Sequence, residues 1–425
     1  MNLSSKRRGF LKRLMAGSVA ALTQPLLVES AEAATHPGFL SDSPQVVDEA
    51  YWQTIKEQFA VPANLMMVNA ANLCPRPQFI TDLIRVTATS LEKDVSFQNR
   101  SQFEARRQLA LEKLAQFIGV SSAEVGITRN TTESNNMLVN GLDFKAGDEI
   151  IIWDQNHPTN GLAWEQKAKR QGFTVKKVSI PAGFTTTQDL IAPFQQAITP
   201  KTRLITFSHI SNSTGLMLPA KELCQLASSR GILTLVDGAQ SFGFMELDLK
   251  TMGCDFYTAS THKWLMGPLE NGILFSKKEH LAKLWPSVIG VGWHDDTQTV
   301  DKKICLLGQR NDPTTSALPA ILDFHEKIGR KTIEDRVRHL TLYLKESIQK
   351  QIPQASFITP LSAQMSGGIV TVSIPGKPSA DLFQKLYSDY GIACASVGNL
   401  RISPHIYNTH SDLDKLVKAL VTLSS

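Results

Sequence analysis

The sequence predicts an α/β fold with a mainly parallel sheet and a functional site at the carboxyl ends of its strands. Short apolar runs at 148–153, 203–208, 232–236 and 256–260 read as buried strands, and helical patterns separate several of them. Polar residues follow directly on these runs. In open α/β sheets ligands bind beyond the strands' carboxyl ends, so these residues are the first candidates for chemistry.

The remaining elements follow from periodicity and capping signals. We expect further short strands at 65–68, 272–275 and 369–374, and helices at 44–59, 102–117, 220–230, 278–285, 318–328 and 412–423. In the helix at 102–117 we expect Leu109, Leu114 and Phe117 to face inward. The chain has 425 residues, 42% hydrophobic and 20% charged, which suits a globular protein with a large core. No apolar stretch reaches the roughly 20 residues of a membrane-spanning helix, so we expect no stable membrane association.

The first 34 residues read as a leader. Lys6, Arg7 and Arg8 precede Gly-Phe-Leu-Lys, an apolar run follows, and Ala31-Glu32-Ala33 offers a cleavage site. This resembles a bacterial twin-arginine signal, which implies the twin-arginine export machinery as partner and a periplasmic location. A basic tail without that role is the alternative. Much of the formal charge of +5 lies in the leader, so the charge does not indicate nucleic acid as a partner.

Residues 233–263 carry the strongest chemical signal. Asp237 and Lys263 follow two of the predicted strands, at 232–236 and 256–260. A lysine can form a Schiff base with a carbonyl compound, and a sheltered acid can keep a pyridine nitrogen protonated, which is the protein's part in pyridoxal 5′-phosphate chemistry. Between them, Gly238 and Ala239 leave space for a flat ring. The alternative is a buried turn acid and a solvated surface lysine.

Other polar groups have matching positions. Gln240 can donate to a ring oxygen, and Ser260 and His262 can donate to a phosphate. Asn130 with Glu133 suits a capping box, which places Thr131 and Thr132 in the first turn of a helix, where a phosphate can bind. Capping without any ligand is the more common use of such threonines.

Several segments together resemble a known family. The segment VDGAQSFG followed by DFYTASTHKWLMGP, with TRNTTES and SHISNSTG before it, is similar to the cofactor signature of class V aminotransferases. These are fold type I pyridoxal-phosphate enzymes and include cysteine desulfurases and isopenicillin N epimerase-like proteins. The resemblance implies a large domain with a seven-stranded, mainly parallel sheet and a smaller α+β domain. We expect a signal peptide at 1–34, a segment at 35–62 that packs on the small domain, the large domain at 63–310 and the small domain at 311–425.

The resemblance also implies roles for individual residues. Lys263 would hold the cofactor and move the α-proton, and Asp237 would stabilise the protonated ring nitrogen. The ring would lie between His157 and Ala239, with Asn212 and Gln240 near its oxygen. The phosphate would be held by Thr131, Thr132, Ser260 and His262. A lone histidine such as His157 is otherwise more often an ordinary loop residue.

Two further segments concern the substrate and the partner. LRISPHIYNT resembles the family's R-x-S-x-x-x-Y-N-T element, whose arginine, here Arg401, pairs with a substrate carboxylate; a structural salt bridge is the alternative. Asn72 is a substrate-side candidate, although a turn asparagine often bonds its own backbone. GQRNDPTTSAL resembles the epimerase-like GTRDPT segment near the dimer interface, but Gln309 and Asn311 depart from it and no catalytic residue is carried over. Enzymes of this fold type usually dimerise, which predicts a homodimer.

The type of reaction stays open at this point. We expect the five cysteines to be mostly buried thiols without metal-binding spacing. A cysteine desulfurase needs a mobile thiol, and Cys394 falls before the expected place, which disfavours that activity. Transamination or oxidative deamination, epimerisation and C–S lysis remain, all through aldimine and quinonoid intermediates.

Two features favour transamination or deamination. One is the predicted export, and the other is a similarity to exported enzymes that tailor the glutamate group of pyoverdine-type siderophores. The substrate would be an amino acid, or an aminoacyl group in a peptide or siderophore-type metabolite. A cofactor-binding carrier or regulatory protein is the non-enzymatic alternative.

Overall fold

The structure is a computed structural model that describes residues 47–424. The predicted leader at 1–34 lies outside the described residues, as does the start of the predicted helix at 44–59. Within the described chain this helix is α2 (Glu49–Lys56), and its N-cap is Asp48, whose side chain accepts the Tyr51 N–H.

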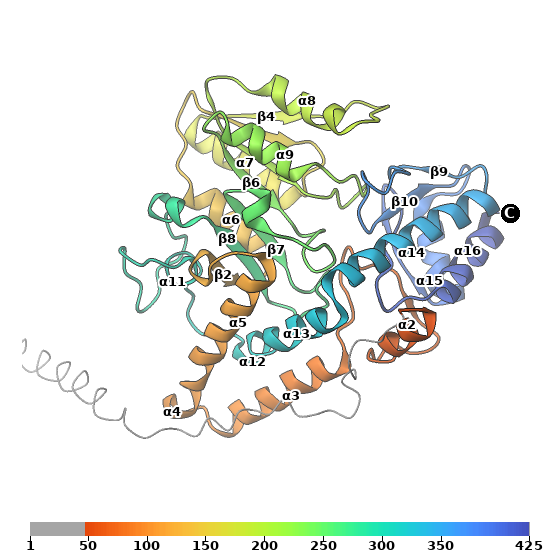
Figure 1. Ribbon diagram of the computed structural model, residues 1–425, viewed down its shortest axis with the longest axis horizontal. Helices are drawn as coiled ribbons and strands as arrows, with labels where there is room; N and C mark the ends of the chain where they lie inside the picture. The colour runs from red at the N-terminus through yellow and green to blue at the C-terminus, as the bar shows by residue number, and fades with distance from the viewer. Residues whose placement is uncertain (1–46, 425) are drawn as a thin grey trace, which may run out of the picture. The chain divides into compact units, whose positions relative to one another are not determined.

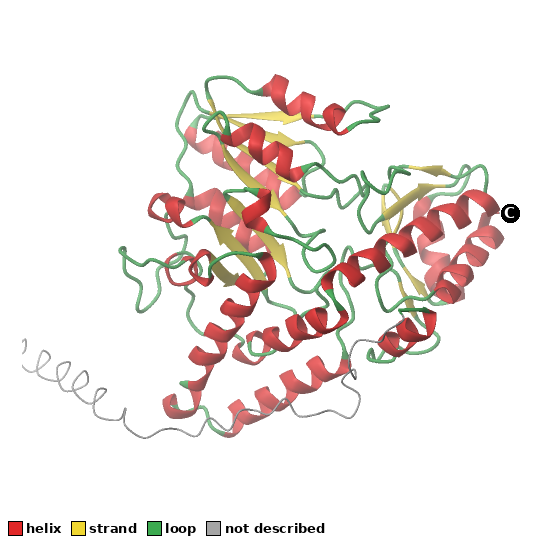
Figure 2. Ribbon diagram, viewed as in Figure 1, coloured by secondary structure: helices red, strands yellow, loops and turns green. Residues whose placement is uncertain are grey.

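A seven-stranded sheet forms the centre of the fold (Figures 1 and 2). The strand order is β2-β8-β7-β6-β5-β3-β4, and all neighbouring pairs except the two that involve β8 are parallel. The strands are β2 (Val125–Thr128), β3 (Glu149–Trp153), β4 (Thr174–Val178), β5 (Thr202–Ser208), β6 (Leu233–Asp237), β7 (Phe256–Ser260) and β8 (Gly272–Ser276). The prediction of a mainly parallel seven-stranded sheet is confirmed.

Both faces of this sheet are buried, as its long apolar runs require. On one face Ile150, Leu204 and Leu235 pack with α6 (Thr131–Gly141) and α7 (Pro158–Gln171). The alternate residues Ile151 and Ile205 are equally buried. The other elements up to residue 328 are α3 (Gln78–Lys93), α4 (Phe97–Arg100), α5 (Gln102–Ile118), η1 (Ser122–Glu124), α8 (Thr187–Ala197), α9 (Ala220–Ser228), α10 (Leu249–Met252), η2 (Lys278–Lys283), α11 (Val300–Lys303), α12 (Asp312–Thr315) and α13 (Leu318–Ile328).

The C-terminal part forms a second, smaller sheet with its own core. Four antiparallel strands follow the order β12-β13-β10-β9, and β1 pairs in parallel with β11. The core of this part joins the second sheet to the C-terminal helices through Leu344, Val370, Leu400 and Leu416. The elements are β1 (Met66–Met67), α14 (Arg330–Gln351), β9 (Ser356–Phe357), β10 (Val370–Ser373), α15 (Ser379–Tyr390), β11 (Ile392–Ala393), β12 (Ala395–Val397), β13 (Asn399–Ile402) and α16 (His410–Ser424).

Two local predictions were wrong. Leu109 is 45% exposed, whereas Leu114 is fully buried. The two lie five residues apart, about 140° around a helix, so they cannot share one buried face. The helix predicted at 278–285 is the short 3₁₀ segment η2, which ends at Lys283. Pro286 disfavours a helical conformation for the residue before it, which explains the early end.

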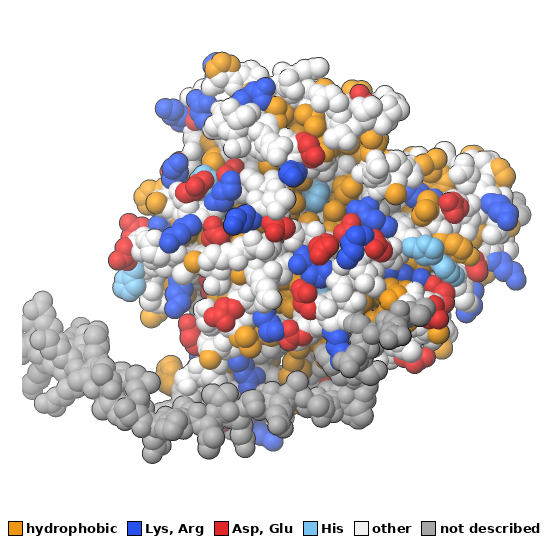
Figure 3. Space-filling view, in the orientation of Figure 1, with side chains coloured by type: hydrophobic (Ala, Val, Ile, Leu, Met, Phe, Trp, Pro, Cys, Tyr) orange, Lys and Arg blue, Asp and Glu red, His pale blue; other side chains and the backbone are white. Residues whose placement is uncertain are grey.

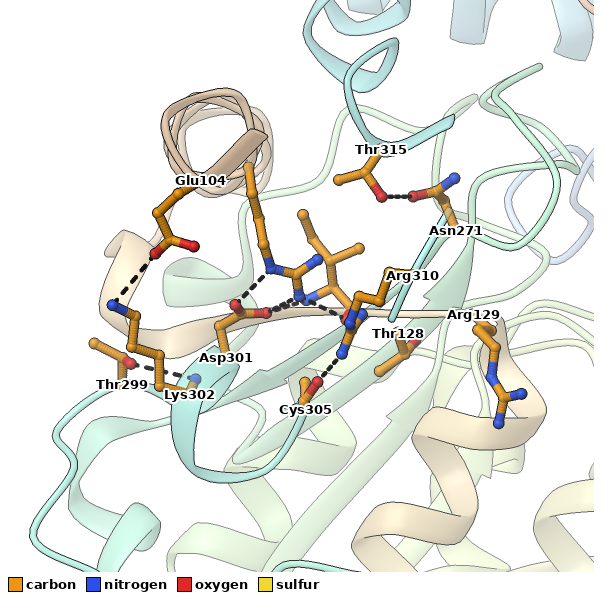
Figure 4. Close-up of polar contacts among 12 residues, drawn as sticks. Glu104, Thr128, Arg129, Asn271, Thr299, Asp301, Lys302, Cys305, Arg310 and Thr315 are labelled. Carbon is orange, nitrogen blue, oxygen red and sulfur yellow. Dashed lines mark hydrogen bonds and ion pairs between the residues drawn. The ribbon is translucent and has the colours of Figure 1, made fainter. Parts of the chain in front are cut away.

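A partly buried ionic cluster closes the outer edge of β2 (Figure 4). Asp301 accepts the Ile127 N–H at 2.9 Å and forms a two-pronged ion pair with Arg107. Arg107 and Arg310 both donate to the Ile127 carbonyl, at 3.1 and 2.8 Å. Because β2 is an edge strand, these side chains satisfy backbone groups that would otherwise be open to pairing with another strand. The cluster therefore anchors β2 just before the predicted phosphate-binding turn.

The surface carries charges of both signs. On the face shown in Figure 3, lysine and arginine side chains are interspersed with aspartate and glutamate. Within residues 47–424, none of the helices combines the length and the apolar character needed to cross a bilayer.

Candidate active site

A cavity of about 260 Å³ lies at the carboxyl ends of the central strands. It is lined by fourteen residues, which are Asn130, Thr131, Thr132, His157, Thr159, Ser208, Ile210, Asn212, Asp237, Ala239, Gln240, Ser260, His262 and Lys263. The ten residues predicted to bind the cofactor are all among them. Parallel strands bring their carboxyl ends to one edge, which explains how segments more than a hundred residues apart meet here.

One end of the cavity is rich in hydroxyl groups. The Asn130 side chain caps α6 by accepting the Glu133 N–H at 3.0 Å. The Glu133 carboxylate accepts the Arg129 N–H, so the predicted reciprocal capping box is only half formed. Thr131 meets Ser260 on β7, with its N–H at 2.8 Å and its hydroxyl at 2.6 Å from Ser260 Oγ. Hydroxyls at a helix N-terminus are suited to hold an anion.

Asp237 occupies the floor of the cavity at the end of β6 and is 2% exposed. Its Oδ1 accepts the Ala239 N–H at 3.1 Å, and its Oδ2 accepts Asn135 Nδ2 at 2.9 Å. Two N–H donors stabilise the charged form of a carboxylate. Each oxygen keeps a further lone pair for a group in the cavity.

Lys263 follows β7 and lines the same cavity. Burial lowers the pKa of its ammonium group, the charge of Arg401 lowers it further, and Asp237 opposes both effects. Among the described residues the Lys263 Nζ makes no hydrogen bond. A lysine in this setting has a larger neutral fraction than a surface lysine, and the neutral amine is the form that attacks carbonyl carbon.

Two histidines border the cavity in neutral form. Burial and the nearby Lys263 charge lower the pKa of His262 to about 4, and its Nδ1 is buried without a partner among the described residues. Burial, Lys263 and Arg401 lower the pKa of His157, with Asp237 opposing them. His157 Nδ1 lies 2.8 Å from Thr159 Oγ1 and also accepts the Thr159 N–H at 3.4 Å. Thr159 therefore orients the His157 ring.

The residues around Asp237 differ in part from what the sequence suggested. A Cβ on Gly238 would lie 1.9 Å from the Tyr257 ring, so Gly238 makes room for that ring and does not line the cavity. Gln240 does line it, but its amide already donates to the Ala71 carbonyl at 2.9 Å and accepts Trp264 Nε1 at 2.8 Å. One N–H of Gln240 is left for a ligand.

Arg401 approaches the site from β13. It is 5% exposed, and burial lowers its pKa to about 10. Its guanidinium donates to the Asn212 carbonyl at 2.8 Å and to Asn69 Oδ1 at 3.1 Å, while its Nε has no partner among the described residues. Asn72 is exposed and lies outside the cavity lining. The nearby asparagine that contacts Arg401 is Asn69, which pairs with Ser403, two residues after Arg401.

Several residues at the site were not predicted from the sequence. Asn135 supports Asp237, Thr159 orients His157, and Ser208 and Ile210 line the cavity. A signal for Asn135 was present, because it follows Thr131 by four residues and therefore shares its helix face. The position of Asn69 depends on pairing between β1 and β11, for which the sequence carries no local signal.

The donor set fits pyridoxal 5′-phosphate. The cavity offers hydroxyl groups and an unpaired histidine nitrogen for an anion, a carboxylate for a ring nitrogen, and an amine without a hydrogen-bond partner among the described residues. When bound, this cofactor withdraws electrons from the carbon that bears a substrate's amino group.

Comparison with known proteins gives the same result. The chain is 29% identical to isopenicillin N epimerase of Amycolatopsis lactamdurans over 394 residues, which cover 88% of this chain and 98% of that protein. Identity to isopenicillin N epimerase of Streptomyces clavuligerus is 32% over 335 residues (74% and 84%). Identity to a probable cysteine desulfurase of Halalkalibacterium halodurans is 32% over 338 residues (73% and 80%).

Solved structures show the same fold. A cysteine desulfurase from Escherichia coli superimposes with a TM-score of 0.78 at 25% identity, covering 89% of this chain and 98% of that one. A C-DES variant with glycine covalently linked to its PLP cofactor gives a TM-score of 0.79 at 22% identity (86% and 98%). Residues 88–416, well over half of the chain, match the family described as Aminotransferase class-V. The protein is therefore an enzyme of the class V aminotransferase family, whose cofactor is pyridoxal 5′-phosphate.

Proposed function

We propose that this enzyme acts on the amino group of an α-amino acid, or of an aminoacyl group in a peptide or siderophore-type metabolite. The reaction is transamination, with an oxo acid as the amino acceptor, or oxidative deamination, with dioxygen as the oxidant. The observation that carries the proposal is Arg401. It is a buried guanidinium whose Nε has no partner in the described part of the chain, and it lies close enough to Lys263 for its charge to affect the lysine. A planar guanidinium suits a carboxylate, so an α-amino acid can bind with its carboxylate at Arg401 and its amino group near Lys263.

The chain's own residues then have separate tasks. Arg401 binds the substrate carboxylate and orients the α-carbon towards Lys263. Lys263 Nζ takes and returns the α-proton, for which its lowered pKa is suited. Asp237 would hold a proton on the ring nitrogen of the cofactor, and His157 would cover the ring and exclude water.

A second candidate is epimerisation at the α-carbon. The two isopenicillin N epimerases aligned over 74–88% of this chain favour it. Persulfide formation as in a cysteine desulfurase is less well supported, because all five cysteines are buried and burial raises the pKa of Cys394 to about 12. A thiol in that state is a poor nucleophile. C–S lysis, which needs no cysteine of the enzyme, stays a third candidate.

The test is to mix the cofactor-loaded enzyme with glutamate or a γ-linked glutamyl peptide. We expect the cofactor's visible band to convert to that of its amine form as an oxo acid appears. Exchange of the α-proton in D₂O, with the other enantiomer accumulating and the band unchanged, would establish epimerisation instead. Sulfide release from cysteine would indicate lyase activity, and no turnover of any amino substrate would contradict the proposal.

Arg401→Lys tests the carboxylate site. We expect kcat/KM to fall about 100-fold for the carboxylated substrate, because lysine cannot make the two-pronged contact. Turnover of an amine that lacks the carboxylate should change little. Equal losses for both substrates would show that Arg401 has a different task.

We further propose that the enzyme is exported and works as a homodimer in the periplasm. The twin-arginine pattern at Arg7 and Arg8 supports the first point, and the dimeric habit of the family supports the second. Cell fractionation of the full chain and of an Arg7→Lys, Arg8→Lys variant tests export. Retention of both forms in the cytoplasm would contradict it, and a monomeric mass in light scattering would contradict the dimer.

A further inference from the structure

A buried chain of polar side chains lies behind Asp237. Thr258 Oγ1 donates to Asn135 Oδ1 at 2.7 Å, and Asn135 Nδ2 donates to Asp237 Oδ2 at 2.9 Å. Asn135 and Thr258 are fully buried, and Asp237 is 2% exposed. Asn135 and Thr258 do not line the cavity, so they can act on a ligand only through Asp237.

The Asp237 carboxylate sets the direction of the Asn135 amide, because a carboxylate only accepts hydrogen bonds, and the Thr258 hydroxyl pairs with the amide oxygen that remains. Its donation to Oδ1 leaves the Asn135 Nδ2 facing the carboxylate. A flipped amide would place its oxygen against Asp237 Oδ2, oxygen against oxygen without a proton between them. The threonine thus holds the amide in place while its N–H donates to Asp237.

The same two elements are linked twice. Helix α6 and strand β7 meet at Thr131 with Ser260 and again at Asn135 with Thr258, at 2.6 and 2.7 Å. The helix residues are four apart and the strand residues two apart, so each pair shares one face of its element. The first link lies at the hydroxyl-rich end of the cavity, and the second lies under Asp237.

We propose that Asn135 and Thr258 are positioning residues that hold the Asp237 carboxylate directed at the cofactor's ring nitrogen. Asn135 and the Ala239 N–H each occupy one carboxylate oxygen and so fix the orientation of the carboxylate. The charge then stabilises the proton on the ring nitrogen. The other titratable groups that act on Asp237 are Lys263, His157 and Tyr257. The inference depends on the family's cofactor and is independent of the proposed reaction.

The experiment is ¹⁵N NMR of the resting holoenzyme, loaded with ring-¹⁵N-labelled pyridoxal phosphate and titrated with alkali. The nitrogen shift reports the proton on the ring directly. In Asn135→Leu we expect the ring to lose this proton at a pH lower by about 1 unit or more, because the carboxylate is no longer held at the ring nitrogen that its charge stabilises. Thr258→Val, which keeps the side-chain shape, should shift the midpoint in the same direction by less.

Two controls separate this role from a general link between α6 and β7. Asn136→Leu removes the neighbouring asparagine and should leave the midpoint unchanged. The Asn136 side chain donates to the Thr132 carbonyl, makes no other hydrogen bond within residues 47–424, and lies outside the cavity lining. Ser260→Ala cuts the other link and should weaken cofactor binding without shifting the ring nitrogen. An unchanged midpoint in both Asn135→Leu and Thr258→Val would overturn the inference. If Asn135→Leu does not fold, Thr258→Val alone decides.

Discussion

His262 allows a quantitative test of how the enzyme holds its cofactor's phosphate. The side chain is neutral at pH 7, because burial and Lys263 lower its pKa to about 4. It therefore offers a hydrogen bond to the phosphate rather than an ion pair. A hydrogen bond to a charged group contributes about 1.5–3 kcal/mol, so His262→Ala should weaken pyridoxal phosphate binding roughly 10- to 100-fold.

The assay compares two ligands. Titrations of the apoenzyme with pyridoxal phosphate and with pyridoxal give two dissociation constants, and only the first ligand has the phosphate. We expect His262→Ala to weaken the binding of pyridoxal phosphate and to leave that of pyridoxal nearly unchanged. His262→Gln, which can still donate, should recover part of the loss, and His294→Ala in an exposed loop should behave as the wild type. Equal losses for both ligands, or none, would refute the placement of the phosphate.

Three further predictions concern Cys394, the loss of stability at acid pH, and the ionic cluster at the edge of β2. Cys394→Ala should keep activity within about threefold, because the thiol is buried with a pKa raised to about 12 and burial keeps it out of reach; complete loss in steady-state assays would revive a thiol mechanism. Burial lowers the pKa of His325 to about 4 and of His405 to about 3, so between pH 6.5 and 4 the unfolded chain binds protons that the folded chain does not. The free energy of unfolding should therefore fall as the pH falls through this window, on the order of 3 kcal/mol per histidine, and urea unfolding curves that do not change between pH 7 and 5 would be inconsistent with this. Asp301→Ala should lower the free energy of unfolding by about 3–5 kcal/mol, because it leaves Arg107 without its partner; a melting temperature equal to that of the wild type would count against the cluster at the β2 edge.

Much of the site could be predicted because its signals are local. The start of α6 is set by Asn130 as N-cap, and β7 and α13 have the bounds that their apolar patterns indicated. Asp237 and Lys263 follow their strands directly, and parallel strands place such residues at one edge of the sheet. A motif that directly follows a parallel strand therefore also predicts where its side chains lie in the fold.

Local signals of this kind cannot predict contacts between segments that are distant in the sequence. Asn69 was missed because its contact with Arg401 spans more than three hundred residues, and Asn72, the nearby candidate, is exposed. Gly238 was assigned to the cofactor, yet the buried Tyr257 ring explains why it is a glycine. Leu109 was placed in the core, but the buried face of α5 is set by the elements that pack on it.

Signals in the sequence were enough to place the four strands β3, β5, β6 and β7 that end at the site, and to select the cofactor motif and the candidate groups for chemistry. These depend on backbone preferences and on spacing along one element. The tertiary structure decided which groups support them, such as Asn135 behind Asp237 and Thr159 beside His157, and which protonation states they adopt. Burial and neighbouring charges set those states, and both arise only when separate segments of the chain come together.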